Sequence, residues 1–177
     1  MSNAKHTRLI AFDIDGVMTD GRITYTSGGT EVKSFNCHDG LALSAARRAG
    51  LKLAVITGRR SAMVERRAEE LQFDYLVMGS KNKSESLKQI CEDAGITMDE
   101  VAYMGDDLND IGVISRVGFP MTPANGCPEI KERALFVSSR SGGNGAVREA
   151  VEYILKEQNL WEKVVAAFLN EDYQQGQ

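Results

Sequence analysis

Cysteine is scarce in this chain of 177 residues, and histidine is scarcer still. The three cysteines, Cys37, Cys91 and Cys127, are scattered and lack the paired spacing of a zinc site or a disulfide framework. We therefore expect reduced, mostly buried thiols in a cytoplasmic protein. The two histidines, His6 and His38, are expected at the surface rather than as ligands.

Long apolar runs and an excess of positive charge are also missing. No stretch reaches the ~18 apolar residues that a membrane span requires, and the first residues lack the pattern of a secretory signal. The net charge is -4, with a calculated isoelectric point of about 5.3. We therefore expect neither nucleic acid nor membrane as a partner, while a small anion such as phosphate still fits this composition.

Linkers, internal repeats and low-complexity tracts are absent as well. A chain of this length forms one domain with a full hydrophobic core. We expect that domain to cover residues 5–170, with a β-hairpin flap at about 22–36 and a disordered polar tail at 171–177.

Strand-like apolar segments alternate with helical segments along the chain. Helices are expected from about 41 to 50, 61 to 71 and 83 to 94, the last one closed by Gly95. This alternation predicts an α/β fold with a doubly wound, Rossmann-like parallel sheet, whose ligands bind at the carboxyl ends of the strands.

One strand end is especially informative, because the apolar segment from Ile10 stops on Asp13 and Asp15. Side chains alternate along a strand, so both carboxylates should leave the sheet on the same side, and Gly16 lets the backbone bend closely around them. Two neighbouring carboxylates repel each other unless a cation or a shared proton intervenes. The segment predicts a metal site or an acid/base pair, with a solvated strand end as the alternative; the spacing does not fit a helix–loop–helix calcium loop.

Three further polar segments follow predicted strands: Thr57-Gly58-Arg59, the residues from Gly79 to Lys83, and Gly105-Asp106-Asp107 with Asp110 about one turn later. Any one of these aspartates is explained by helix capping. Together with Asp13 and Asp15, however, the number of carboxylates at one sheet edge calls for a hard cation such as Mg²⁺. Lys83 and Thr57 would then hold a phosphoryl group.

In this order, the motifs Asp13-Ile14-Asp15-Gly16, Thr57, Lys83 and Gly105–Asp110 resemble the haloacid dehalogenase superfamily of phosphatases. The resemblance implies that Asp13 attacks phosphorus, while Asp15 protonates the leaving alcohol and then activates water. It also implies that Thr57 and Lys83 hold the phosphoryl oxygens. Mg²⁺ would be bound by the side chains of Asp13 and Asp106 and the backbone carbonyl of Asp15, with Asp107 and Asp110 in support.

Only a hairpin separates the first motif from the first helix, which resembles the branch of the superfamily without a cap domain. More narrowly, the chain resembles the phosphatases of 3-deoxy-D-manno-octulosonate 8-phosphate, through residues 15–21, Phe35-Asn36, Asp39-Gly40, 57–59 and 142–149. That family assembles as homotetramers through the hairpins and acts in the synthesis of lipopolysaccharide precursors, so the same is expected here. The substrate contacts expected from the resemblance are Gly16, Thr19, Asp39, Gly58, Arg59 and Arg67.

A related family cleaves the 9-phosphate of a nine-carbon sugar acid of the sialic-acid type. Those phosphatases tend to carry Glu where Arg59 stands and Lys where Glu70 stands, so this chain departs from their pattern at both positions. The guanidinium of Arg59 would favour a sugar acid carboxylate, and Arg67 is a second candidate that could act across a subunit boundary.

Two readings without catalysis stay open at this point. One is a receiver-like signalling domain, although receivers place the phosphorylated aspartate after the third strand rather than the first. The other is an oligomerisation module descended from a phosphatase. The glycine-rich run at 142–145 also has two interpretations. It either contributes to the function of the site or only provides a flexible entry to the next helix.

Overall fold

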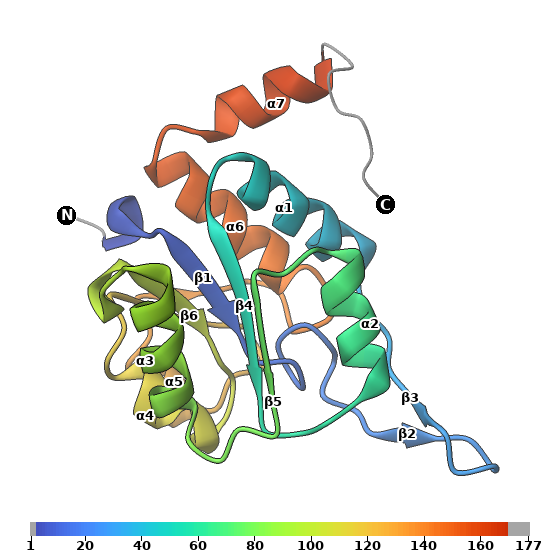
Figure 1. Cartoon of the computed structure of the whole chain (residues 1–177). Helices are drawn as coiled ribbons and strands as arrows, with labels where there is room; N and C mark the ends of the chain where they lie inside the picture. Colours follow the sequence, from blue (N-terminus) through green and yellow to red (C-terminus); the bar gives the residue numbers. More distant parts are fainter. Residues whose placement is uncertain (1–2, 170–177) are drawn as a thin grey trace.

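A computed structural model of the chain describes residues 3–169, so the tail expected at 171–177 lies outside the described residues. Its centre is a parallel six-stranded sheet in the order β5-β4-β1-β6-β7-β8 (Figure 1). The strands are, in sequence order, β1 (Leu9–Phe12), β4 (Lys52–Thr57), β5 (Tyr75–Met78), β6 (Val101–Met104), β7 (Phe119–Thr122) and β8 (Phe136–Val137). The predicted doubly wound parallel sheet is therefore confirmed.

Helices cover both faces of the sheet, and β1 shows why. Ile10 and Phe12 belong to one buried cluster, whereas Leu9 and Ala11 belong to another, because successive side chains point to opposite faces. The first cluster includes residues of α1 (Cys37–Arg48), α2 (Ala62–Glu70) and α6 (Ala146–Glu157), and α7 (Trp161–Leu169) packs beside it. The second includes residues of α3 (Lys83–Ala94), α4 (Ile111–Ile114) and α5 (Pro128–Lys131).

The expected flap is present as a short antiparallel hairpin that projects from the body of the molecule (Figure 1). It pairs β2 (Thr24–Tyr25) with β3 (Glu31–Val32), and no cap domain lies between β1 and α1. The described residues also form three short 3-10 helices: η1 (Asn3–His6), η2 (Met98–Glu100) and η3 (Leu108–Asp110). They precede β1, β6 and α4 respectively.

Two sequence predictions need correction. The helix expected from residue 41 begins at Cys37, because the Asn36 side chain accepts a hydrogen bond from the His38 N–H and caps the helix earlier. The cysteines are also less buried than expected, since Cys37 is exposed and Cys127 is half-buried, leaving only Cys91 in the core. Among residues 3–169, no helix combines the length and apolar character needed to span a membrane.

Truncation of the core between α3 and the sheet should measurably weaken the fold. Leu87 of α3 is fully buried, whereas Leu135, before β8, is 63% exposed. We expect Leu87→Ala to lower the free energy of unfolding by about 2–5 kcal/mol, since it leaves a cavity. The control Leu135→Ala should change it by about 0.5 kcal/mol or less. Urea denaturation followed by circular dichroism measures both, and equal effects of the two substitutions would contradict this packing.

Candidate active site

The carboxyl ends of three neighbouring strands place the predicted residues at one edge of the sheet. Strand β1 pairs with β4 on one side and with β6 on the other, all in parallel. Asp13 follows β1, Thr57 ends β4, and Asp106 comes two residues after β6. The start of α3 adds Lys83, and the turn before α4 adds Asp110. The convergence predicted from the strand ends is therefore seen for Asp13, Lys83, Asp106 and Asp110.

Lys83 is the centre of this edge, because its ammonium group lies between two carboxylates. Its Nζ is 2.7 Å from Asp13 Oδ2 and 2.7 Å from Asp110 Oδ1. All three residues are buried. Burial lowers the pKa of Lys83, but the two carboxylates more than offset this and hold the pKa above its usual value. Lys83 is therefore a fixed cation beside Asp13.

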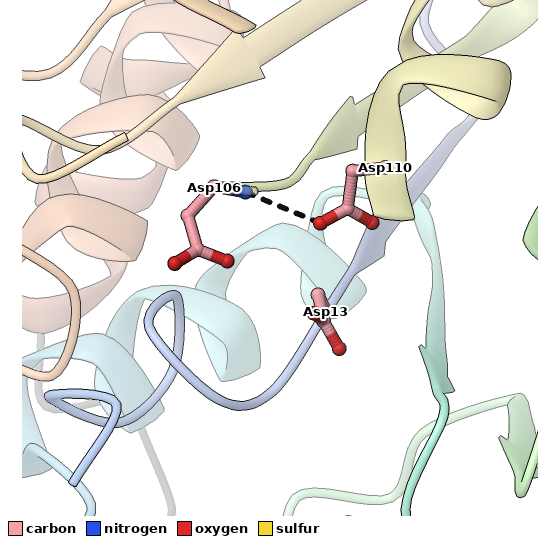
Figure 2. A group of neighbouring side chains, drawn as sticks. All are labelled: Asp13, Asp106 and Asp110. Carbon is pink, nitrogen blue, oxygen red and sulfur yellow. Dashed lines mark hydrogen bonds between the residues drawn. The ribbon is translucent and has the colours of Figure 1, made fainter. Parts of the chain in front are cut away.

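Asp110 is held by three donors and acts as the support of this cation. Besides Lys83, the Tyr103 hydroxyl donates to Oδ1 at 2.7 Å, and the Asp106 N–H donates to Oδ2 at 3.3 Å (Figure 2). Gly105 is needed for this arrangement, because a Cβ there would lie 2.5 Å from the Asp110 carboxyl carbon. Both oxygens of Asp110 are thus committed within the protein.

Asp13, Asp106 and Asp110 are neighbouring side chains (Figure 2). One carboxylate oxygen each of Asp13, Asp106 and Asp110 lie within 4.8 Å of one another. Burial raises the pKa of Asp13 to about 6, although Lys83 opposes this. Burial, followed by the charge of Asp13, raises the pKa of Asp106 to about 7. The charge of Asp110 also raises the pKa of Asp13, so several carboxylates at this site disfavour one another's ionised form.

A divalent cation fits between these two carboxylates. Asp13 and Asp106 both offer oxygen atoms, which Mg²⁺ prefers, and the repulsion between them is what a cation would relieve. At Gly16 the backbone comes unusually close to the Asp106 carboxylate. Its φ is +87°, and a Cβ on this residue would lie only 2.0 Å from Asp106 Oδ2. The residues present therefore fit the magnesium ion expected from the sequence, with Asp110 as support.

Asp15 lies at the same sheet edge but contacts different partners. The strand ends at Phe12 and a turn begins at Ile14, so the strict alternation of a strand no longer holds there. Asp15 Oδ1 pairs with Lys33 of the hairpin, and Asp15 Oδ2 lies 3.8 Å from Arg59 Nε. Its side chain thus stands beside the flap, apart from the three clustered aspartates.

Thr57 and Gly58 form the turn that leaves β4. Thr57 is buried, and its Oγ1 accepts a hydrogen bond from the Arg59 N–H at 3.4 Å. A Cβ at Gly58 would come no nearer than 3.7 Å to the Ser80 carbonyl oxygen, so packing alone does not require glycine there. Thr57 therefore lies at the carboxyl end of the strand next to β1, as the sequence predicted.

Asp39 and Thr19, two of the expected substrate contacts, make internal hydrogen bonds. Asp39 Oδ1 accepts the backbone N–H of Arg148 at the start of α6, at 2.8 Å. Its Oδ2 has no partner among the described residues, and burial raises the pKa of Asp39. Thr19 is buried and donates to the Ile14 carbonyl at 3.3 Å. Both side chains therefore support the loops around the crevice.

Arg67 and Asp107 make contacts with residues other than Asp13, Asp106 and Asp110. Arg67 packs its guanidinium 5.9 Å from the centre of the Phe35 ring and pairs with Glu70 at 3.2 Å. Asp107 is exposed and accepts a hydrogen bond from the Leu108 N–H, which caps η3. In the structure, the side chain of Asp107 therefore acts as a helix cap.

The glycine-rich run packs directly on the loop that follows Asp15. A Cβ at Gly142 would lie 1.9 Å from the Gly16 carbonyl oxygen, and a Cβ at Gly143 would lie 2.6 Å from the Asp20 nitrogen. Asn125 links the two segments, since its side chain donates to the Gly16 carbonyl at 2.9 Å and accepts the Gly142 N–H at 2.6 Å. The glycines therefore permit close packing that fixes the loop around Asp15.

Sequence reasoning missed several residues of this site. Tyr103 carried a weak signal, because a hydroxyl in an otherwise apolar buried strand needs a partner. Nothing in the sequence pattern singled out Asn125, Lys33 or Glu31. These contacts join segments far apart in sequence, so local patterns do not reveal them.

Comparisons with known proteins identify the family to which this chain belongs. Residues 76–151 match the family of haloacid dehalogenase-like hydrolases. The 3-deoxy-D-manno-octulosonate 8-phosphate phosphatase KdsC of Escherichia coli strain K12 is 37% identical over 155 residues, which are 88% of this chain and 82% of that protein. The protein of the same name from Yersinia pestis is 35% identical over 162 residues, 92% of this chain and 87% of that protein.

Solved structures are similar over nearly the whole chain. The 3-deoxy-D-manno-octulosonate 8-phosphate phosphatase of Moraxella catarrhalis, in complex with magnesium ion, phosphate ion and KDO, gives a TM-score of 0.92 at 43% identity. The match covers 94% of this chain and 95% of that one. The cobalt-bound phosphatase of the same sugar phosphate from Haemophilus influenzae gives 0.87 at 31% identity, over 90% and 93% of the two chains.

The raised pKa values of Asp13 and Asp106 predict how pH and magnesium act on stability. Without metal, the folded protein binds protons at these groups more tightly than the unfolded chain does, so their contribution to stability is lost as pH rises from about 4 through 7. Magnesium must displace those protons. We expect the increase in melting temperature caused by Mg²⁺ to be larger at about pH 8 than at about pH 5. Thermal denaturation with Mg²⁺ and with EDTA measures this, and a pH-independent increase would contradict it.

Proposed function

This chain belongs to the haloacid dehalogenase-like hydrolases, and we propose that it hydrolyses 3-deoxy-D-manno-octulosonate 8-phosphate to the free sugar acid and phosphate. The observation that carries the reaction type is the buried Lys83 between Asp13 and Asp110, with Asp106 beside them. A fixed cation next to a carboxylate at the end of a strand suits a nucleophile that attacks an anionic phosphate ester. The relatives named above support the substrate.

We propose Asp13 as the nucleophile. One of its oxygens attacks phosphorus, the bond to the sugar oxygen breaks, and an aspartyl phosphate forms. The Ile14 N–H, which donates to Asp13 Oδ1 at 2.7 Å, and Lys83 fix the orientation of this carboxylate. Thr57 and Lys83 hold the phosphoryl oxygens during transfer.

Asp15 serves as the acid and base of the proposed reaction. Its carboxyl group donates a proton to the sugar oxygen as that oxygen leaves phosphorus. In the second half of the reaction, the carboxylate takes a proton from the water that attacks the aspartyl phosphate and releases inorganic phosphate. The position of Asp15 beside the flap, apart from the metal-binding carboxylates, suits contact with the leaving group.

Mg²⁺ is the proposed cofactor, held by the side chains of Asp13 and Asp106 and the Asp15 backbone carbonyl, with Asp107 and Asp110 in support. When bound, the ion neutralises part of the charge on the transferring phosphoryl group. The fit of Asp13 and Asp106 around a cation, and a magnesium-containing relative, support this assignment.

The substrate contacts that we propose are Gly16, Thr19, Asp39, Gly58, Arg59 and Arg67. We propose Arg59 as the residue that selects the substrate, and its contacts with Asp15 and Glu31 beside the proposed acid/base residue support this. A guanidinium there favours the carboxylate of a sugar acid. The 9-phosphate of a nine-carbon sugar acid is the rival substrate.

We propose a single catalytic domain over residues 5–170 and a homotetramer joined through the hairpins. An isolated two-stranded hairpin is marginally stable, and this one exposes Ile23, Tyr25 and Val32. Partner hairpins would cover these side chains. The reaction would take place in the cytoplasm, as a step in the synthesis of lipopolysaccharide precursors.

Loss of the nucleophile should abolish turnover without loss of the fold. Asp13→Asn nearly conserves volume but gives a poor nucleophile, so we expect activity to fall by about a thousandfold or more. Asp99→Asn, at an exposed position before β6, is the control and should keep full activity. Phosphate release with saturating Mg²⁺ measures both. Turnover by Asp13→Asn within about tenfold of the unmodified protein would contradict the proposed mechanism.

Substrate preference tests the role of Arg59. We expect a higher kcat/KM for 3-deoxy-D-manno-octulosonate 8-phosphate than for the nine-carbon 9-phosphate, and Arg59→Glu should narrow or reverse that preference. Arg66→Glu on the exposed face of α2 should leave the preference unchanged. Equal or better use of the nine-carbon substrate by the unmodified protein would overturn the substrate assignment while leaving the phosphatase chemistry intact.

The oligomeric state tests the role of the hairpin. Light scattering should give the mass of four chains of 19.4 kDa each. Val32→Asp should shift that mass toward smaller species, because a charge would be buried between hairpins. A fully active single chain at micromolar concentration would contradict the tetramer.

A further inference from the structure

The side chain of Lys33 is buried although the residue belongs to the projecting hairpin. Its side chain is only 2% exposed, whereas Val32 next to it is 43% exposed. The Nζ of Lys33 contacts Asp15 Oδ1 and lies 3.7 Å from Glu31 Oε1. A buried ammonium group is costly unless it is paired, so these two carboxylates fix its place.

Glu31 ties the hairpin to the turn after β4. Its Oε1 accepts a hydrogen bond from Arg59 Nη2 at 2.9 Å, and its Oε2 accepts one from the Ser61 hydroxyl at 2.8 Å. Arg59 in turn reaches Asp15, with 3.8 Å between its Nε and Asp15 Oδ2. Two acids, Asp15 and Glu31, therefore share two cations, Lys33 and Arg59. We call these four residues the flap network.

The flap network is separate from the contacts of Lys83. Lys83 pairs with Asp13 and Asp110, whereas Lys33 and Arg59 pair with Asp15 and Glu31. The nucleophile and the acid/base residue thus each have a lysine of their own. Because Lys33 comes from the hairpin of the same chain, the position of that hairpin sets the position of the Asp15 carboxyl group.

We propose that Lys33 is a positioning residue for proton transfer by Asp15, and that Glu31 fixes Lys33 and Arg59 for this purpose. The inference rests on the proposed function. In the first half of the reaction, an Asp13 oxygen bonds to phosphorus and the bond from phosphorus to the sugar oxygen breaks. The electron pair stays on the sugar oxygen, which takes the Asp15 proton. The Asp15 carboxylate so formed is stabilised by the adjacent Lys33 ammonium group.

This role predicts that Lys33 matters only when the leaving group needs a proton. A sugar alcohol leaves phosphorus poorly without protonation, whereas p-nitrophenol leaves readily as its anion. The ratio kcat/KM reports the steps up to departure of the leaving group, before water attacks. A comparison of kcat/KM for the two kinds of ester therefore isolates proton donation from general damage to the site.

The test is Lys33→Met in the full-length protein with Mg²⁺. For 3-deoxy-D-manno-octulosonate 8-phosphate, we expect kcat/KM to fall about 10- to 100-fold, since Asp15 is still present but no longer held. For p-nitrophenyl phosphate, kcat/KM should stay within about threefold, which also shows that the variant is folded. Lys33→Arg should retain most of the activity on the sugar ester. Lys88→Met, on the exposed face of α3, should change neither value.

An equal fall of kcat/KM on both esters, or no fall on either, would overturn the proposed role of Lys33. Failure of the unmodified protein to cleave the sugar acid phosphate would instead contradict the proposed substrate. The same comparison would then use glycerol phosphate as the alkyl ester, with the same expected contrast between Lys33→Met and the unmodified protein.

Discussion

The ammonium group of Lys83, enclosed between the carboxylates of Asp13 and Asp110, is the interaction on which the site depends. A buried charge costs several kcal/mol unless it is paired and hydrogen-bonded, and removal of one partner leaves that cost uncompensated. The Tyr103 hydroxyl and the Asp106 N–H complete the set around Asp110. Strands β1 and β6, which end at this edge, are buried along their whole length. In such surroundings an ion pair is electrostatically stronger, and an unpaired charge is more costly, than in water.

The rest of the site follows from this fixed centre. With Lys83 and Asp110 neutralising each other, Asp13 and Asp106 are left facing each other, and that repulsion favours a divalent cation. The loop after Asp13 stays close because Gly16 has no side chain to displace Asp106. The hairpin then adds a second, separate set of charges around Asp15. The parallel sheet thus supports two charge networks, and we propose that one serves the nucleophile and the other serves proton transfer.

The parallel sheet and the convergence of the aspartates and Lys83 were predictable from the sequence, because these residues directly follow strands or begin the next helix. Strands that alternate with helices predicted the parallel sheet, and the residues after each strand predicted that Asp13, Lys83 and Asp110 converge. What could not be predicted are contacts set by loop geometry. Lys33 looked like an ordinary strand residue, because the burial of its side chain depends on its pairing with Asp15, a residue 18 positions earlier in the chain. The hydrogen bond between Asp39 and the start of α6 could not be predicted either, because it depends on how two helices pack.

The central claim is that Asp13, fixed by Lys83, becomes phosphorylated during turnover. Borohydride reduces an aspartyl phosphate to homoserine, so the intermediate can be trapped by rapid quenching during hydrolysis of 3-deoxy-D-manno-octulosonate 8-phosphate. Peptide mass spectrometry then locates the modified residue. We predict homoserine at position 13, dependent on both substrate and Mg²⁺. Modification at Asp15 or Asp106 instead, or none in a sample that is turning over substrate, would contradict the account.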